Sequence, residues 1–199
     1  PYGGGLQQAE PASASLAALV IVVLATVSFD GFAETMAWLR LEGAAIAWLY
    51  GRGVVHVLGY PAAEALIRTA GLLAAPLVLA AAYLAAAALS ARIDGRPVGG
   101  TARRYALSLV PIAIGYHLAH YFSYLLVQGQ EIWPLLSDPL GRGWDLFGTR
   151  GHEVDLAAVD MRLVWLAAVG GIVAGHVAAV LVAHRSASGV RGQLPIVVL

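Results

Sequence analysis

Apolar segments long enough to cross a lipid bilayer dominate this chain. They cover residues of about 12–29, 69–90, 105–127 and 161–183. A spanning helix needs about 20 predominantly apolar residues, and each segment meets or approaches that length. The composition agrees, because 59% of the 199 residues are hydrophobic and only 12% are charged. We therefore predict an all-α, polytopic transmembrane helix bundle that forms a single integral membrane domain over residues 1–199.

Both ends of the sequence look incomplete. A new apolar run begins at residue 194 and stops at Leu199, and the chain opens at Pro1 without a Met. We therefore expect the start of a fifth helix at 194–199, beyond the four complete ones, and interpret the sequence as a portion of a longer protein.

The charges of the connections predict the orientation of the helices. The 91–104 connection has four Arg and one acid, and the 184–193 connection has two Arg and no acid. Loops rich in Arg stay in the cytoplasm, so the loops at 30–68 and 128–160 are expected to face outward. The first of these mixes charged groups with Trp38 and Trp48, which is typical of an interfacial or re-entrant segment.

Composition also limits the chemistry. The chain has no Cys, which excludes disulfides and thiolate metal sites. The net charge is zero, so nothing indicates a nucleic-acid partner. The expected partners are the lipid bilayer and other membrane subunits.

A stripe of polar side chains marks the outer half of the third apolar segment. His117, His120, Tyr124 and Gln128 follow one another at steps of three, four and four, which places them on one helical face. Ionisable residues inside a membrane are costly and usually functional. The other interpretation is that each imidazole hydrogen-bonds to a neighbour and only specifies helix packing.

Carboxylates from the outward loops could complete a site with these histidines. Asp30 and Glu34 are four residues apart at the outer end of the first segment. Together with His117 and His120 they are candidate ligands for a divalent transition metal such as Zn, Fe, Mn or Cu. Asp145 is a further candidate, as a partner of the site or as a catalytic acid–base group.

Two other patterns carry predictions. Residues 137–149, SDPLGRGWDLFGT, combine turn-forming residues with Trp144 and Phe147, which can anchor a loop at the membrane interface. This loop is either a lid over the helix bundle or a packed extramembrane turn. The small residues Ala167, Gly171, Gly175 and Ala179 recur at steps of four, which favours close packing between helices of one chain over a dimer interface.

Three stretches resemble a family of bacterial polytopic membrane proteins. They are SFDGFAET at 28–35, YHLAHYFSYLLVQGQ and SDPLGRGWDLFGT within 116–149, and GHVAAVLVAHR at 175–185. Some members of that family are called fenitrothion hydrolase, an organophosphate esterase. The resemblance implies a multi-pass protein of the bacterial inner membrane and a hydrolytic reaction, but it names no catalytic residue.

Three function classes remain open from the sequence. The first is a metal- or cofactor-binding protein or an accessory subunit of a larger membrane complex. The second is a membrane-embedded metal-dependent organophosphate hydrolase, in which a metal-bound hydroxide attacks the phosphotriester and Asp145 accepts the proton. The third is a proton- or ion-coupled transporter that uses the polar stripe as a relay.

Overall fold

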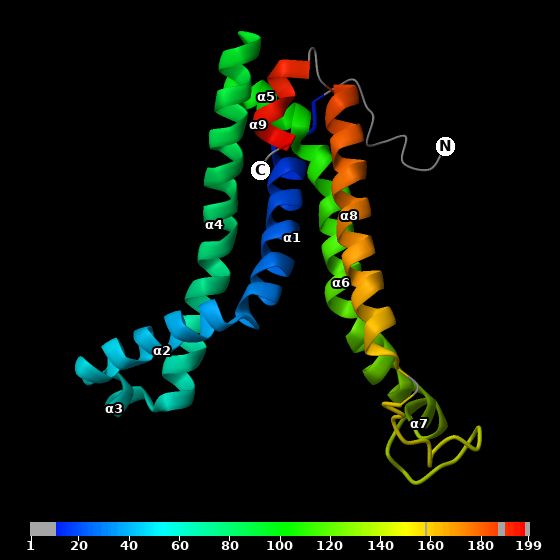
Figure 1. The fold of residues 1–199 in the computed structure, drawn as a ribbon. Helices are drawn as coiled ribbons and strands as arrows, with labels where there is room; N and C mark the ends of the chain where they lie inside the picture. Colours follow the sequence, from blue (N-terminus) through cyan, green and yellow to red (C-terminus); the bar gives the residue numbers. More distant parts are fainter. Residues whose placement is uncertain (1–10, 158, 187–189, 198–199) are drawn as a thin grey trace. The chain divides into compact units, whose positions relative to one another are not determined.

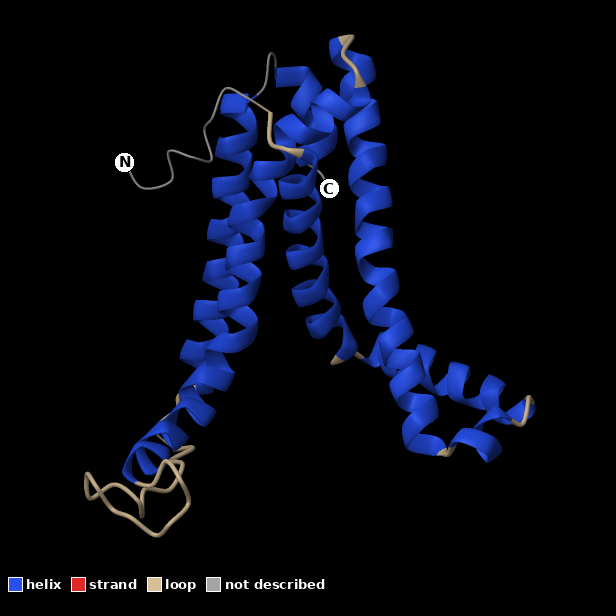
Figure 2. Cartoon of the chain, turned by 180° about the vertical axis from the view of Figure 1, so that it is seen from behind, coloured by secondary structure: helices blue, strands red, loops and turns tan. Residues whose placement is uncertain are grey.

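The computed structural model describes residues 11–157, 159–186 and 190–197, which form helices and turns without a strand (Figure 1, Figure 2). Four helical segments are long and apolar enough to cross a membrane: Ala14–Ala33, Tyr60–Asp94, Val98–Ser137 and Met161–Arg185. The predicted all-α fold with four spanning segments is therefore confirmed. The described residues divide into two compact units. The first contains the residues up to Ala113 and those from His176 onward, and the second contains Ile114–Gly175.

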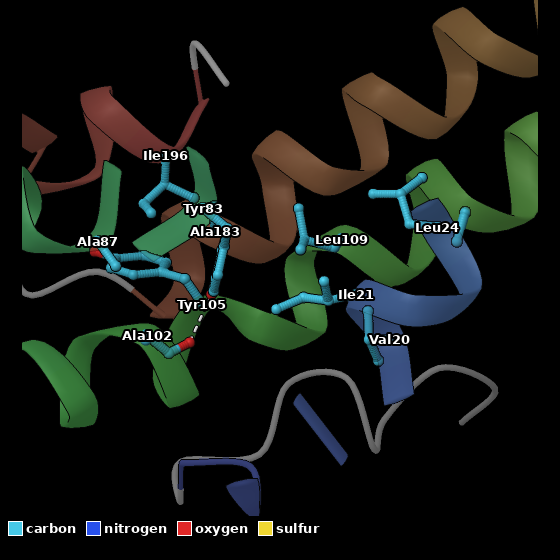
Figure 3. Packing of buried hydrophobic residues seen from close by; sticks show 11 residues of the cluster. Val20, Ile21, Leu24, Tyr83, Ala87, Ala102, Tyr105, Leu109, Ala183 and Ile196 are labelled. Atoms are coloured by element: carbon cyan, nitrogen blue, oxygen red, sulfur yellow. Dashed lines mark hydrogen bonds between the residues drawn. The ribbon is translucent and has the colours of Figure 1, made fainter. Parts of the chain in front are cut away.

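The first unit is built around α4 (Tyr60–Asp94), which packs against α1 (Ala14–Ala33), α5 (Val98–Tyr105) and α9 (Val190–Val197). It also contains η2 (Ala106–Ser108), the first turn of α6 (Leu109–Gln128) and the last part of α8 (Met161–Ser186). Its core lies in the C-terminal half of α4, the half that leads into the Arg-rich 91–104 segment, and side chains from these helices meet there (Figure 3).

Two tyrosines form the centre of that core. Tyr83 and Tyr105 are each only 1% exposed. The Tyr83 hydroxyl donates a hydrogen bond of 2.6 Å to the Ala102 carbonyl, drawn as the dashed line in Figure 3. Because an unpaired hydroxyl is costly in an apolar environment, this bond fixes α4 against α5 in one arrangement.

The segment expected between the first two spans is helical. It forms α2 (Met36–Gly51) and α3 (Val54–Leu58), and α2 lies across the ends of α1 and α4 (Figure 1). Thr35 caps α2, since its Oγ1 accepts the Trp38 N–H at 3.3 Å. A helix of 35 residues such as α4 is about 52 Å long and exceeds the hydrocarbon core of about 30 Å.

Several helix bounds differ from those expected. The helix predicted at 69–90 already begins at Tyr60, because Gly59 adopts a positive φ of 82° at the N-cap and Pro61 suits the first helical turn. The segment predicted at 105–127 is divided into α5, η2 and α6. The helix expected from 194 begins at Val190.

The second unit joins α6 to α8 through a structured connection. After α6 come η3 (Gly129–Glu131), α7 (Ile132–Ser137) and the loop of residues 138–157, which we call the 138–157 loop. Gly115 of α6 lies directly against Gly171 and Gly175 of α8. The small-residue ladder therefore serves close packing inside the chain at these two positions, as the sequence indicated.

Candidate functional site

The two histidines of the predicted site lie on α6 within the second unit. Both are half-buried, and both contact the ring of Tyr121. The His120 and Tyr121 rings meet edge to face with centroids 4.8 Å apart, and the His117 and Tyr121 centroids are 6.0 Å apart. Tyr121 was not part of the predicted stripe, although its spacing of four from His117 could have indicated this contact.

The carboxylates proposed as co-ligands lie in the first unit. Asp30 and Glu34 are exposed near the C-terminal end of α1. Within the described residues no group of three or more His, Asp and Glu is placed so as to hold a metal ion. The joint site of His117, His120, Asp30 and Glu34 therefore stays a prediction.

Asp145 has a structural partner in the 138–157 loop. Its Oδ1 accepts the backbone N–H of Arg150 at 3.0 Å. The Arg150 guanidinium in turn donates to the Gly143 carbonyl at 2.9 Å. A change at Asp145 would consequently disturb the loop itself, in addition to any chemistry that the carboxylate performs.

A buried serine is the hub of this loop. Ser137 is 0% exposed, and its Oγ accepts the backbone N–H groups of Phe147 and Thr149, each at 3.2 Å. Thr149 Oγ1 donates to the Trp133 carbonyl at 2.7 Å, so the Ser137 hydroxyl donates to Thr149 Oγ1 at 2.9 Å. One side chain thus ties the end of α7 to the far side of the loop.

An aspartate next to this hub closes the first turn of the loop. The Asp138 carboxylate accepts the N–H groups of Arg142 and Gly143, both at 2.7 Å. Gly143 adopts a positive φ of 82°, which a residue with a side chain rarely does. Further along, the Gln130 side chain accepts the Asp155 N–H and donates to the Asp155 carbonyl.

Large apolar side chains project from this hydrogen-bonded loop. Leu140 is 61% exposed, Trp144 40%, Leu146 59% and Phe147 69%. The Arg142 guanidinium lies over the Trp144 ring, 5.7 Å from its centroid. The loop is therefore an ordered framework that presents a set of exposed large apolar side chains.

Comparison of the chain with protein-family models, with curated proteins and with solved structures gives no match.

One charged cluster was missed in the sequence. Glu42 of α2 is only 7% exposed, and Arg68 of α4 donates to its carboxylate at 2.8 Å. Arg68 also pairs with Glu64 at 3.0 Å. Glu42 and Arg68 are 26 residues apart in the sequence, so no helical spacing connects them. The pair fixes α2 against α4, and its tertiary origin explains why sequence periodicity did not reveal it.

Acidification is expected to loosen the 138–157 loop. Desolvation by itself would raise the pKa of the Asp138 carboxyl. The hydrogen bonds from the backbone N–H groups of Gly143 and Arg142 outweigh this effect, so the pKa lies below its ordinary value. A lowered pKa in the folded protein stabilises the turn above the unfolded pKa of about 4. This contribution is lost as the pH falls through the lowered folded value.

The measurement is amide hydrogen exchange at Arg142 and Gly143 as the pH is lowered, corrected for the intrinsic exchange rates. Protection should stay constant between pH 7 and about pH 5 and decrease below about pH 4. Asp138→Asn should show weaker protection at pH 7 and no such decrease. Equal acid sensitivity in the wild type and in Asp138→Asn would contradict the assignment to this carboxyl.

Proposed function

We propose that this chain is an accessory subunit that docks on another membrane protein through the 138–157 loop. The observation that carries the proposal is the exposed hydrophobic surface of a loop held rigid by internal hydrogen bonds. Contiguous exposed apolar side chains mark interaction sites, and Trp and Phe are enriched in the centres of protein interfaces. A preformed surface also loses less conformational entropy on binding than a mobile one.

The hydrogen bonds of the loop support docking rather than simple membrane anchoring. A Trp and a Phe can anchor a loop in lipid headgroups without any fixed mutual geometry. Here Ser137 and Asp138 fix the backbone on which Trp144 and Phe147 stand. Fixed geometry is useful against a protein surface of defined shape and adds little against a fluid bilayer.

Photo-crosslinking in native membranes tests this proposal. A photoreactive amino acid at position 147 should give one discrete adduct with a second polypeptide, and Ser137→Ala should abolish that adduct. Ser123→Ala, which lies on α6 outside the hub, should leave it intact. The same probe at Val57, which is 84% exposed on α3, serves as the positional control. Adducts with lipid only, or an adduct that survives Ser137→Ala, would contradict docking.

The histidine pair supports a second candidate, a bound metal. His117 and His120 lie one turn apart and share Tyr121 as a neighbour, so α6 alone offers up to three donor groups. A third protein ligand and an open position would give the catalytic type of metal site. The organophosphate hydrolase implied by the sequence resemblance belongs to this candidate, since a metal-bound water would be its nucleophile.

Elemental analysis of the purified, detergent-solubilised protein tests this candidate. One equivalent of metal in the wild type that is absent from His117→Ala/His120→Ala would establish the site, and hydrolysis of a phosphotriester would then be assayed with both proteins. Absence of metal from both would leave the histidines a role in packing or in proton transfer. Ion flux in proteoliposomes that depends on the two histidines would favour the transporter class.

A further inference from the structure

An open apolar cleft lies in the first unit, between α1, α4 and α5. It has a volume of about 690 Å³, within the range of pockets that hold small organic ligands. Ala18 and Ile21 line it from α1, and Leu77 and Ala80 line it from α4. Tyr83, which is hydrogen-bonded to the Ala102 carbonyl, also lines it. The shape is fixed by the same contacts that form the core.

Polarity changes at one end of the cleft. Among the described residues that line it, Arg103 is the only charged one. Arg103 Nε donates to the Gly99 carbonyl at 3.4 Å, which holds the guanidinium beside the first turn of α5. The surrounding 91–104 segment carries four Arg against one acid. An elongated apolar ligand with an anionic head would match this arrangement of charge.

The dimensions fit one leaflet of a membrane. From Pro76 to Leu84 on α4, and from Ala14 to Val22 on α1, the lining residues cover about 12 Å of helix. Half of the hydrocarbon core is about 15 Å thick. The Arg-rich end lies on the cytoplasmic side by the charge rule, and that leaflet carries the anionic lipids.

We propose that this cleft binds an anionic phospholipid, with one acyl chain between α1 and α4 and the phosphate at Arg103. The complementarity between the Arg-rich end and a phosphate selects this occupant over a purely apolar helix. The proposal is independent of the docking role of the 138–157 loop, which belongs to the other unit.

Native mass spectrometry of the purified protein, titrated with phosphatidylglycerol or with phosphatidylcholine, tests the site. Phosphatidylglycerol should be retained in a one-to-one complex and phosphatidylcholine should bind at least fivefold more weakly. Arg103→Gln should weaken phosphatidylglycerol binding about fivefold, since one Arg near a membrane surface contributes about 1 kcal/mol. Arg92→Gln, an exposed neighbour outside the cleft, should have a smaller effect. Equal losses in both variants would indicate diffuse attraction and overturn the site.

A second pair of variants tests the acyl-chain position. Ala18→Trp fills the cleft from the exposed side of α1 and should abolish the one-to-one complex. Ala81→Trp places the same side chain on the exposed surface of α4 outside the cleft and should leave binding unchanged. Unaltered thermal unfolding of both variants would show that the fold is retained. If Ala18→Trp fails to fold, a photoreactive residue at Leu77 replaces it, with a lipid adduct expected. A polypeptide adduct at that position, or binding that survives Ala18→Trp, would overturn the proposal.

Discussion

Replacing Gly115 by Ala is expected to destabilise the packing of α6 on α8 by about 3 kcal/mol, the upper part of the range for overpacked sites. A Cβ at this position would lie 2.7 Å from the Gly171 carbonyl oxygen and 3.4 Å from the Gly175 Cα. Both of these neighbours are backbone atoms, so no side-chain rotation can relieve the contact. Two spanning helices would have to separate, and the dispersion contacts that hold helices together in a membrane would weaken along the interface.

Gly170→Ala is the matched control for this prediction. Gly170 lies on the same helix as Gly171, and a Cβ there meets no atom within 4 Å. Because Ala is the better helix former, this variant should be unchanged or more stable by up to about 1 kcal/mol. The measurement is thermal unfolding of the detergent-solubilised proteins, followed by tryptophan fluorescence. Equal stability of Gly115→Ala and Gly170→Ala would show that α6 and α8 are not in backbone contact at this point.

Replacing Ser137 by Ala is expected to open the 138–157 loop. The variant loses the acceptor for two backbone N–H groups and the donor to Thr149. Each polar group left without a partner in a buried position costs about 1–3 kcal/mol, and solvent entering the opened loop relieves part of that cost. We expect a local loss of about 3 kcal/mol, which corresponds to roughly 100-fold faster amide exchange at Phe147 and Thr149.

Hydrogen exchange followed by mass spectrometry measures this effect directly. Peptides that cover residues 140–150 should exchange faster in Ser137→Ala, whereas peptides from α1 and α4 should be unaffected. Ser123→Ala removes a hydroxyl of the same size from α6 and should leave exchange in the loop unchanged. Unaltered exchange in Ser137→Ala would mean that the loop does not depend on the serine, and would remove the physical basis of the docking proposal.

Local sequence determined the fold class and most of the elements. Apolar length is a property of consecutive residues, so the spans containing residues 14–33 and 161–185 could be recognised without any tertiary information. Pro61 shows the limit of this reasoning, because a proline breaks a helix when it lies in the interior but favours helix initiation when it lies in the first turn. Whether Pro61 did one or the other depended on the positive φ of Gly59, which the sequence permitted without requiring.

The candidate site was only partly accessible from the sequence. His117 and His120 were recognised because their spacing places them on one face of one helix. The role of Ser137 and the pairing of Glu42 with Arg68 were not recognised, because these contacts join residues 10 to 26 positions apart and depend on turns and helix packing.

The sequence by itself therefore determined that this is an all-α membrane protein, since hydrophobic length and helical period act over neighbouring residues. Only the tertiary structure decided that Asp145 holds the backbone of its own loop, that Gly115 is in contact with Gly171, and that an apolar cleft ends at Arg103. The physical reason is that a hydrogen bond, a close contact or a cavity between distant segments depends on the positions of those segments in space. The spacing of residues along the chain does not specify these positions.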